Sequence, residues 1–257
     1  MEILVCVKRV PTVGGVLTLT ADERAIDTKA SGFTISPHEE CAVEEAVRLA
    51  ERFGGSVTVA SLGPVAAEEQ LRACLALGAS TAVLLETADG VETGPIATAA
   101  ALHSVAAAGS FDLVLLGNEA SDTGGYQVGI RLAHLLGRPV ATGIKAISVS
   151  DDASSLAASR TYRGILETFT LPLPCVVTVK EGINLPRYPS LPGRLRAKRA
   201  SIARVAVTEP GPASAGDVRM TRLRVPEAPR KQATVLGRGP DAVPALVAVL
   251  AEIGVLS

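Results

Sequence analysis

The sequence predicts an α/β protein built on a doubly wound, mostly parallel sheet, and three observations support this fold class. Short apolar runs alternate with helix-like segments from the amino terminus to Gly137. Helix start and stop signals separate them, as in PHEECAVEEAVRLAERFGG, which begins with Pro, carries early acids and ends in Gly-Gly. Regular β-α alternation is typical of a parallel sheet with helices on both faces.

Four β-α units are expected in order. The predicted strands are ILVCVKRV, SVTVASLGP, TAVLLE and FDLVLLG, and each is followed by a predicted helix. Between the first strand and the first helix, residues 12–35 are rich in Gly, Thr and Asp, which indicates a long loop carrying a small hairpin. After Gly137 several strands follow without long helices, so antiparallel additions to the sheet are expected.

The carboxyl-terminal part of the chain differs in composition. VTEPGPASAGDV is rich in Pro, Ala and Gly, as linkers are, and a last helix is predicted over residues 241–253. We therefore predict an α/β domain at 1–207, followed at 208–257 by a linker and an extended arm. A lone helix cannot bury its own apolar face, so the arm should pack on another surface. That face comprises Val243, Leu246, Val247, Leu250 and Ile253.

Composition excludes several classes of function. A net charge of −1 supplies no basic field for nucleic acid, and the absence of Trp disfavours base-stacking platforms. The four cysteines form no CxxC pair, so no metal site is expected and buried thiols in a reducing cytoplasm are favoured. Neither a signal peptide nor a membrane span is expected. No Ser-His-Asp or Cys-His set has a suggestive spacing, so we expect no catalysis by side chains.

The junction GNEASDTGGYQVGIRLAHLLG, after the fourth strand, is the main candidate site. Glycines let a backbone approach a ligand, and hydroxyls with the N–H groups of a helix start suit phosphate oxygens. A plain strand-to-helix turn capped by Asp122 or Thr123 explains the same residues, and both interpretations stay open. The chain lacks the lysine of a phosphate-binding P-loop and the GxGxxG of nicotinamide enzymes, which disfavours a nicotinamide-dependent dehydrogenase.

Several strings resemble, in the same order, the β subunit of electron transfer flavoproteins. They include ILVCVKRV, LGPVAAEEQLRACLALGA, DLVLLGNEASD and, as the most specific, LPCVVTVKEGINLPRYPSLPGRLRAKR. The resemblance extends to about Arg199 and implies a Rossmann-like, adenine-nucleotide-binding domain. It implies a heterodimer with an α subunit, FAD at the subunit interface, and a role in electron transport linked to fatty acid oxidation. An ATP- or AMP-binding sensor or stress-type domain of the same architecture is the alternative.

The resemblance also implies the ligand and its site. The β subunit holds AMP in most members and a second FAD in electron-bifurcating ones, and the loop here lacks the Asp-Gly-Asp-Thr run of the latter. His38 is expected either to contact the nucleotide or to be a solvated helix start. The matching cofactor-binding positions are Cys6, Ser36, Pro37, His38, Glu39, Leu62, Asp122, Thr123, Gly124, Gly125, Tyr126, Gln127, Val128 and Gly129.

Partner-docking positions follow from the same resemblance. Arg187 and Tyr188 lie between two prolines in a stiff loop that docks acyl-CoA or related dehydrogenases, with Leu191 as the apolar anchor; the alternative is that Leu191 packs on its own sheet. Glu167 matches a residue that holds the partner's flavin domain, or is a surface carboxylate. Electrons would pass to a membrane quinone oxidoreductase. Glu44 and Glu45 are expected on a solvated helix face.

Overall fold

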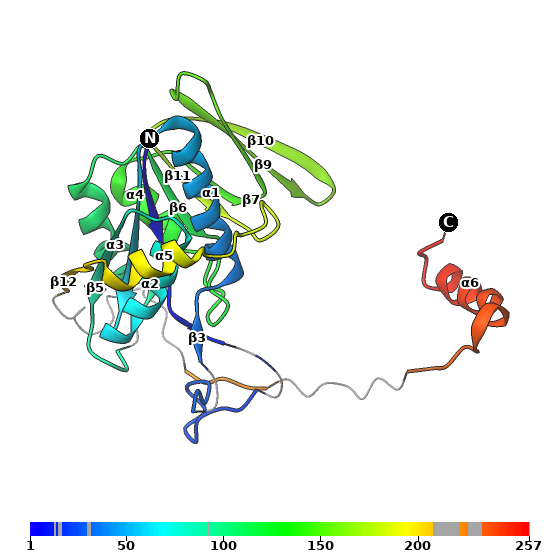
Figure 1. Cartoon of the computed structure of the whole chain (residues 1–257). Helices are drawn as coiled ribbons and strands as arrows, with labels where there is room; N and C mark the ends of the chain where they lie inside the picture. Colours follow the sequence, from blue (N-terminus) through cyan, green and yellow to red (C-terminus); the bar gives the residue numbers. More distant parts are fainter. Residues whose placement is uncertain are drawn as a thin grey trace. The chain divides into compact units, whose positions relative to one another are not determined.

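The computed structural model describes residues 1–12, 14, 17–29, 32–91, 93–207, 221–225 and 233–256. Most of the predicted linker therefore lies outside the described residues. The chain divides into two compact units, Met1–Leu223 and Arg224–Ser257 (Figure 1). The predicted boundary between 207 and 208 stays a prediction.

A seven-stranded parallel sheet forms the centre of the first unit and confirms the predicted fold class. The strand order is β12-β5-β4-β1-β6-β11-β7, so β1 lies in the middle. The strands are β1 (Glu2–Cys6), β4 (Ser56–Gly63), β5 (Thr81–Glu86), β6 (Leu113–Gly117), β7 (Val140–Ile144), β11 (Cys175–Val179) and β12 (Ala203–Ala206).

Helices cover both faces of this sheet (Figure 1). Because side chains alternate along a strand, Ile3 and Val5 of β1 pack in one core with α1 and α2, while Leu4 and Cys6 pack in the other with α3 and α4. The helices are α1 (Pro37–Phe53), α2 (Glu68–Leu77, after the 3-10 turn Val65–Ala67), α3 (Pro95–Ala108), α4 (Val128–Leu136) and α5 (Leu191–Arg199).

The antiparallel strands form a sheet of their own, which corrects the expectation that they extend the central sheet. β8 (Ala146–Val149), β9 (Ser155–Tyr162) and β10 (Ile165–Pro172) pair in the order β10-β9-β8, whereas β7 and β11 join the central sheet in parallel. The turn between β9 and β10 is Arg163-Gly164, and both residues have positive φ (50° and 79°). Such a pair matches the twist of a tight two-residue hairpin, which explains why these strands pair locally.

Smaller elements complete the described chain. β2 (Val10–Pro11) pairs with β3 (Phe33–Thr34), and Leu19 bridges Ile26 within the loop where a hairpin was predicted. In the second unit, a 3-10 turn (Gly239–Ala242) leads into α6 (Val243–Glu252), close to the predicted helix, and none of the residues of α6 is buried. No helix in the described part of the chain is long and apolar enough to cross a membrane.

Candidate functional site

The strand order reverses at the carboxyl ends of β1 and β6, and we call this place the crevice. After β1 the chain builds outward through β4 and β5, and it then returns to β6 on the opposite side of β1. Ligands of open α/β sheets bind at this reversal, because the connections leave the two strand ends in opposite directions. The segment after β1, the start of α1 and the predicted junction after β6 all meet here.

An ion pair crosses the crevice. Nζ of Lys8, just after β1, lies 2.8 and 2.7 Å from the two carboxylate oxygens of Asp122, and 3.5 Å from the hydroxyl of Thr123. The Asp122 side chain is 21% exposed. Lys8 therefore brings a positive charge to the predicted loop. The sequence analysis did not assign Lys8 to the site.

The start of α1 forms the second wall of the crevice. Ser36 is buried before the helix, and its hydroxyl donates to the backbone carbonyl of Glu119 at 3.4 Å. One carboxylate oxygen of Glu39 accepts from the backbone N–H of Lys8 at 2.9 Å and of Ser36 at 3.4 Å. Burial raises the pKa of Glu39 to about 8, although these hydrogen bonds and Lys8 oppose the shift. Pro37 at the first helical position suits the start of the helix.

His38 is not a solvated helix start, which removes one of the two alternatives for this residue. Its side chain is only 13% exposed, and Nδ1 lies 4.0 Å from Oε1 of Glu119. That buried nitrogen has no hydrogen-bond partner among the described residues. Burial lowers the pKa of His38, and the nearby Glu119 opposes this. A buried polar atom without a hydrogen-bond partner needs an explanation, and a ligand that reaches Nδ1 of His38 would provide one.

The loop after β6 has the backbone conformation of a binding loop. Gly124 and Tyr126 both have positive φ (55° and 56°), and a Cβ on Gly125 would meet nothing within 4 Å. Tyr126 is 54% exposed, and a hydrogen bond with Glu119 raises its pKa. Gln127 is occupied, because its side-chain carbonyl accepts two hydrogen bonds from Arg131, at 3.1 and 2.8 Å. The first N–H groups of α4, from Val128 onward, lack helical partners.

Close packing sets the position of α4. A Cβ on Gly129 would lie 2.4 Å from the Cγ2 atom of Thr178 on β11, so only glycine allows this approach. The hydroxyl of Thr178 donates to the side-chain carbonyl of Asn118 at 2.8 Å and accepts from the N–H of Gly143 at 3.1 Å. The loop is therefore joined to the ends of β11 and β7.

Cys6 is the last residue of β1 and Leu62 the second-last residue of the neighbouring strand β4, and their side chains face the core shared with α3 and α4. Burial raises the pKa of the Cys6 thiol to about 12, so it stays protonated and unreactive at neutral pH. Both residues can offer the crevice only their backbone and an apolar surface. No group of three His, Cys, Asp or Glu residues in the described chain is arranged to hold a metal.

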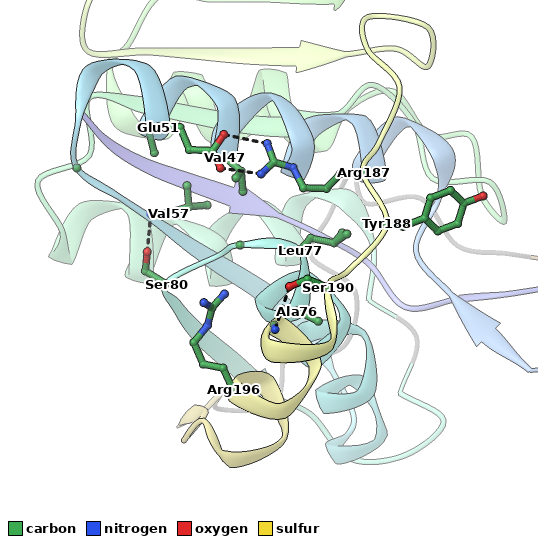
Figure 2. A pocket seen from close by; sticks show the side chains of 14 residues that line it. Val47, Glu51, Val57, Ala76, Leu77, Ser80, Arg187, Tyr188, Ser190 and Arg196 are labelled. Atoms are coloured by element: carbon green, nitrogen blue, oxygen red, sulfur yellow. Dashed lines mark hydrogen bonds and ion pairs between the residues drawn. The ribbon is translucent and has the colours of Figure 1, made fainter.

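A separate cavity of about 550 Å³ lies at the opposite edge of the sheet (Figure 2). Gly55 and Val57 at the start of β4 line it, together with Gly78 and Ser80 before β5. It therefore belongs to the amino ends of the strands and is not part of the crevice. Arg187 and Tyr188 of the predicted docking loop line it too, as do Ser190 and Arg196.

Comparisons with known proteins identify the family of the chain. A family model described as "Electron transfer flavoprotein domain" matches residues 24–210. Similar proteins include the "Electron transfer flavoprotein subunit beta" of Bacillus subtilis, 38% identical over 175 residues (68% of this chain, 67% of that protein). The protein of the same name from Homo sapiens is 33% identical over 258 residues (99% and 98%). The chain belongs to the electron transfer flavoprotein β-subunit family. Membership supports a role in an electron transfer flavoprotein.

The loop predicted to dock partners exposes two of its predicted docking side chains to solvent. Tyr188 is 94% exposed and Leu191, the first residue of α5, is 71% exposed, so Leu191 does not pack on its own sheet. Arg187 behaves differently, since its guanidinium is paired with Glu44 and Glu51 of α1. The expectation of a solvated helix face was wrong for Glu44, whose side chain is 3% exposed. The Glu45 carboxylate accepts a hydrogen bond from the side-chain amide of Asn184 at 2.9 Å.

Glu167 lies on β10 opposite Arg160 of β9, and the two side chains form an ion pair of 2.7 Å. The guanidinium of Arg160 also donates to the carbonyl of Thr142 at 2.9 Å. Glu167 is therefore held in place on the hairpin, and its side chain is 34% exposed. Its predicted contact with a partner subunit stays a prediction.

Proposed function

We propose that this chain is the β subunit of a heterodimeric electron transfer flavoprotein and holds an adenine nucleotide in the crevice between β1 and β6. The observation that supports the site best is the convergence of Lys8, His38 and the glycine loop at the reversal of strand order. These residues are far apart in the sequence. A bound nucleotide would explain why the Lys8 cation, an imidazole nitrogen without a hydrogen-bond partner and a glycine with free space around it lie at the same site.

The chemistry of the crevice fits a phosphate and a ribose. Nζ of Lys8, the hydroxyl of Thr123 and the N–H groups at the start of α4 are donors suited to phosphate oxygens. The open space at Gly125 lets the phosphate approach the backbone. The Glu119 carboxylate can only accept hydrogen bonds, so it suits a ribose hydroxyl. AMP is the proposed ligand, and FAD is the alternative for this site.

Redox chemistry belongs to a flavin, FAD, bound where this chain meets the α subunit; when bound, it accepts and donates the electrons. The residues of this chain orient the nucleotide and form the surfaces for partners. Acyl-CoA or related dehydrogenases are the proposed donors, and a membrane quinone oxidoreductase is the proposed acceptor, in fatty acid oxidation. The α subunit would cover α6, whose Val243 and Leu246 are 53% and 46% exposed. The cytoplasmic location stays a prediction.

The decisive experiment is co-expression of this chain with an α-like neighbouring gene. We expect a yellow heterodimer that releases one AMP per FAD on denaturation, measured by mass spectrometry and absorbance. Release of two FAD per heterodimer would mean that FAD, and not AMP, occupies the crevice. A colourless chain that binds ATP would favour the sensor alternative, and a flavin-bearing heterodimer without any second nucleotide would refute the proposed site.

A further inference from the structure

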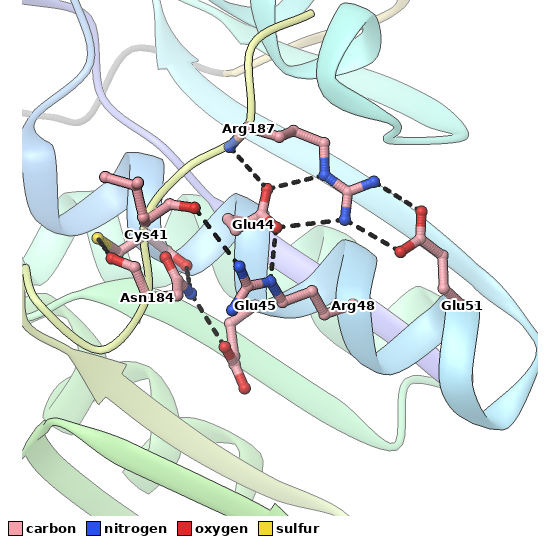
Figure 3. Close-up of polar contacts among 8 residues, drawn as sticks. Cys41, Glu44, Glu45, Arg48, Glu51, Asn184 and Arg187 are labelled. Atoms are coloured by element: carbon pink, nitrogen blue, oxygen red, sulfur yellow. Dashed lines mark hydrogen bonds and ion pairs between the residues drawn. The ribbon is translucent and has the colours of Figure 1, made fainter.

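The segment that carries the exposed docking residues is fixed along α1 by polar contacts (Figure 3). Residues 184–190 cross the helix, and one face of α1 supplies the partners of Asn184, Leu185 and Arg187. These partners recur at helical spacing, so they form a row under the segment. They are Cys41, Glu44, Glu45, Arg48 and Glu51.

Arg187 is the centre of these contacts. Its Nε and one terminal nitrogen donate to the two oxygens of Glu44, at 2.9 and 3.2 Å, and its backbone N–H donates to Glu44 at 3.1 Å. The guanidinium also donates to both oxygens of Glu51, at 2.6 and 3.0 Å. Burial would raise the pKa of Glu44, but hydrogen bonds from Arg187 and Arg48 lower it below its usual value. Glu44 is therefore a buried, ionised carboxylate that requires its arginines.

Two further contacts fix the ends of the segment. The Asn184 side-chain amide donates to the carbonyl of Cys41 at 3.0 Å and to Glu45 at 2.9 Å. Ser190 caps α5 by accepting from the N–H of Gly193 at 3.1 Å. Between these ends the segment runs beside the 550 Å³ cavity rather than over a packed core (Figure 2). The Arg187 contacts therefore replace the apolar packing that would otherwise hold the middle of the segment.

This arrangement leaves three apolar side chains facing solvent. Leu185 is 83% exposed, Tyr188 is 94% exposed and Leu191 is 71% exposed. In contrast, the Arg187 side chain between them is 34% exposed and its charge is matched by carboxylates. Immobilising flexible side chains on binding costs free energy, so a segment ordered in advance binds more tightly.

We propose that Arg187 is a positioning residue, whose guanidinium fixes residues 184–190 on α1 so that Leu185, Tyr188 and Leu191 are presented together to a dehydrogenase. The proposal rests on the proposed docking function. Arg187 acts through its neighbours and does not itself need to touch the partner. Lysine cannot replace it, because a single ammonium cannot pair with two carboxylates in a fixed plane.

Hydrogen exchange of the heterodimer, without any dehydrogenase, tests the first half of this proposal. In Arg187→Lys, the backbone amide of residue 187 should exchange about ten-fold faster, because its hydrogen bond to Glu44 loosens. Arg52→Lys is the matched control, since Arg52 lies on α1, is 59% exposed and pairs with Asp151 instead of with the segment. Equal exchange in both variants would overturn the proposal, whatever the docking function is.

Affinity for a purified acyl-CoA dehydrogenase of the same organism tests the second half. Arg187→Lys should weaken binding about ten-fold in the wild-type background. It should have little effect in a background in which Leu185, Tyr188 and Leu191 are all replaced by alanine, because a positioning residue acts only through what it positions. A general loss of fold stability would weaken binding in both backgrounds and refute the proposal. If Leu191→Ala and Tyr188→Ala leave affinity unchanged, the docking function itself fails. If they weaken binding and Arg187→Lys does not, only the positioning role fails.

Discussion

Replacing Gly129 by alanine should displace α4 from the crevice. The new methyl carbon would lie 2.4 Å from Cγ2 of Thr178, whereas carbon atoms pack at about 3.5–4.0 Å. The helix must therefore retreat by more than about 1 Å. Overpacking of this kind costs about 1–3 kcal/mol, and a cost of 2 kcal/mol lowers Tm by roughly 4–8 °C in a domain of this size.

Thr178 cannot avoid the methyl group by rotating. Its hydroxyl is held between Asn118 and Gly143, and turning Cγ2 away would break both hydrogen bonds. A threonine side chain is also stiff at χ1. The start of α4 and the loop before it should therefore shift together, and binding of AMP to the heterodimer should weaken at least ten-fold, which corresponds to about 1.4 kcal/mol.

Thermal denaturation and AMP titration by calorimetry measure the two effects on the heterodimer. Gly125→Ala is the matched control, because its methyl group meets nothing within 4 Å and should leave Tm unchanged. It should nevertheless weaken AMP binding, since the phosphate would occupy that space. Thr178→Ser removes Cγ2 and keeps the hydroxyl. Added to Gly129→Ala, it should therefore bring Tm back to the wild-type value. A Gly129→Ala protein with wild-type Tm and affinity would refute the packing argument.

Three further predictions concern other parts of the chain. The pKa of Glu39 is about 8 in the folded chain and near 4.5 in the unfolded chain. Between pH 4.5 and pH 8 the folded state therefore keeps a proton that the unfolded state loses. The free energy of unfolding should fall with rising pH in this range, by up to about 1.4 kcal/mol per pH unit. Glu39→Gln should flatten that slope in urea unfolding, and an unchanged slope would contradict the assignment. Lys8→Met should weaken AMP binding about ten-fold or more by calorimetry, with Lys198→Met as the exposed control; equal affinities would exclude Lys8 from the site. The chain expressed alone should self-associate in sedimentation, and Leu246→Lys should reduce this; a monomeric wild type would argue against an uncovered α6 face.

The local signals in the sequence were sufficient for four of the seven strands of the central sheet, β1, β4, β5 and β6. Each of these four strands is a short apolar run, and the helices between them have their own start and stop residues. These features depend on neighbouring residues, so they are visible without a structure. The separate antiparallel sheet was missed because its main determinant is the Arg163-Gly164 turn, whose conformation decides that β9 and β10 pair with each other.

The charged residues of the site show which contacts a sequence conceals. Glu44 and Arg48 look like an ordinary surface pair at helical spacing, and nothing nearby reveals that Glu44 is buried by Arg187, 143 residues away. Lys8 was within reach of prediction: it follows the first strand, as Asp122 follows the fourth, and in a doubly wound sheet those two strand ends are neighbours. Topology thus identifies polar residues that meet at strand ends. It does not identify a buried ion pair between a helix face and a distant loop, because that contact depends on how the loop returns across the helix.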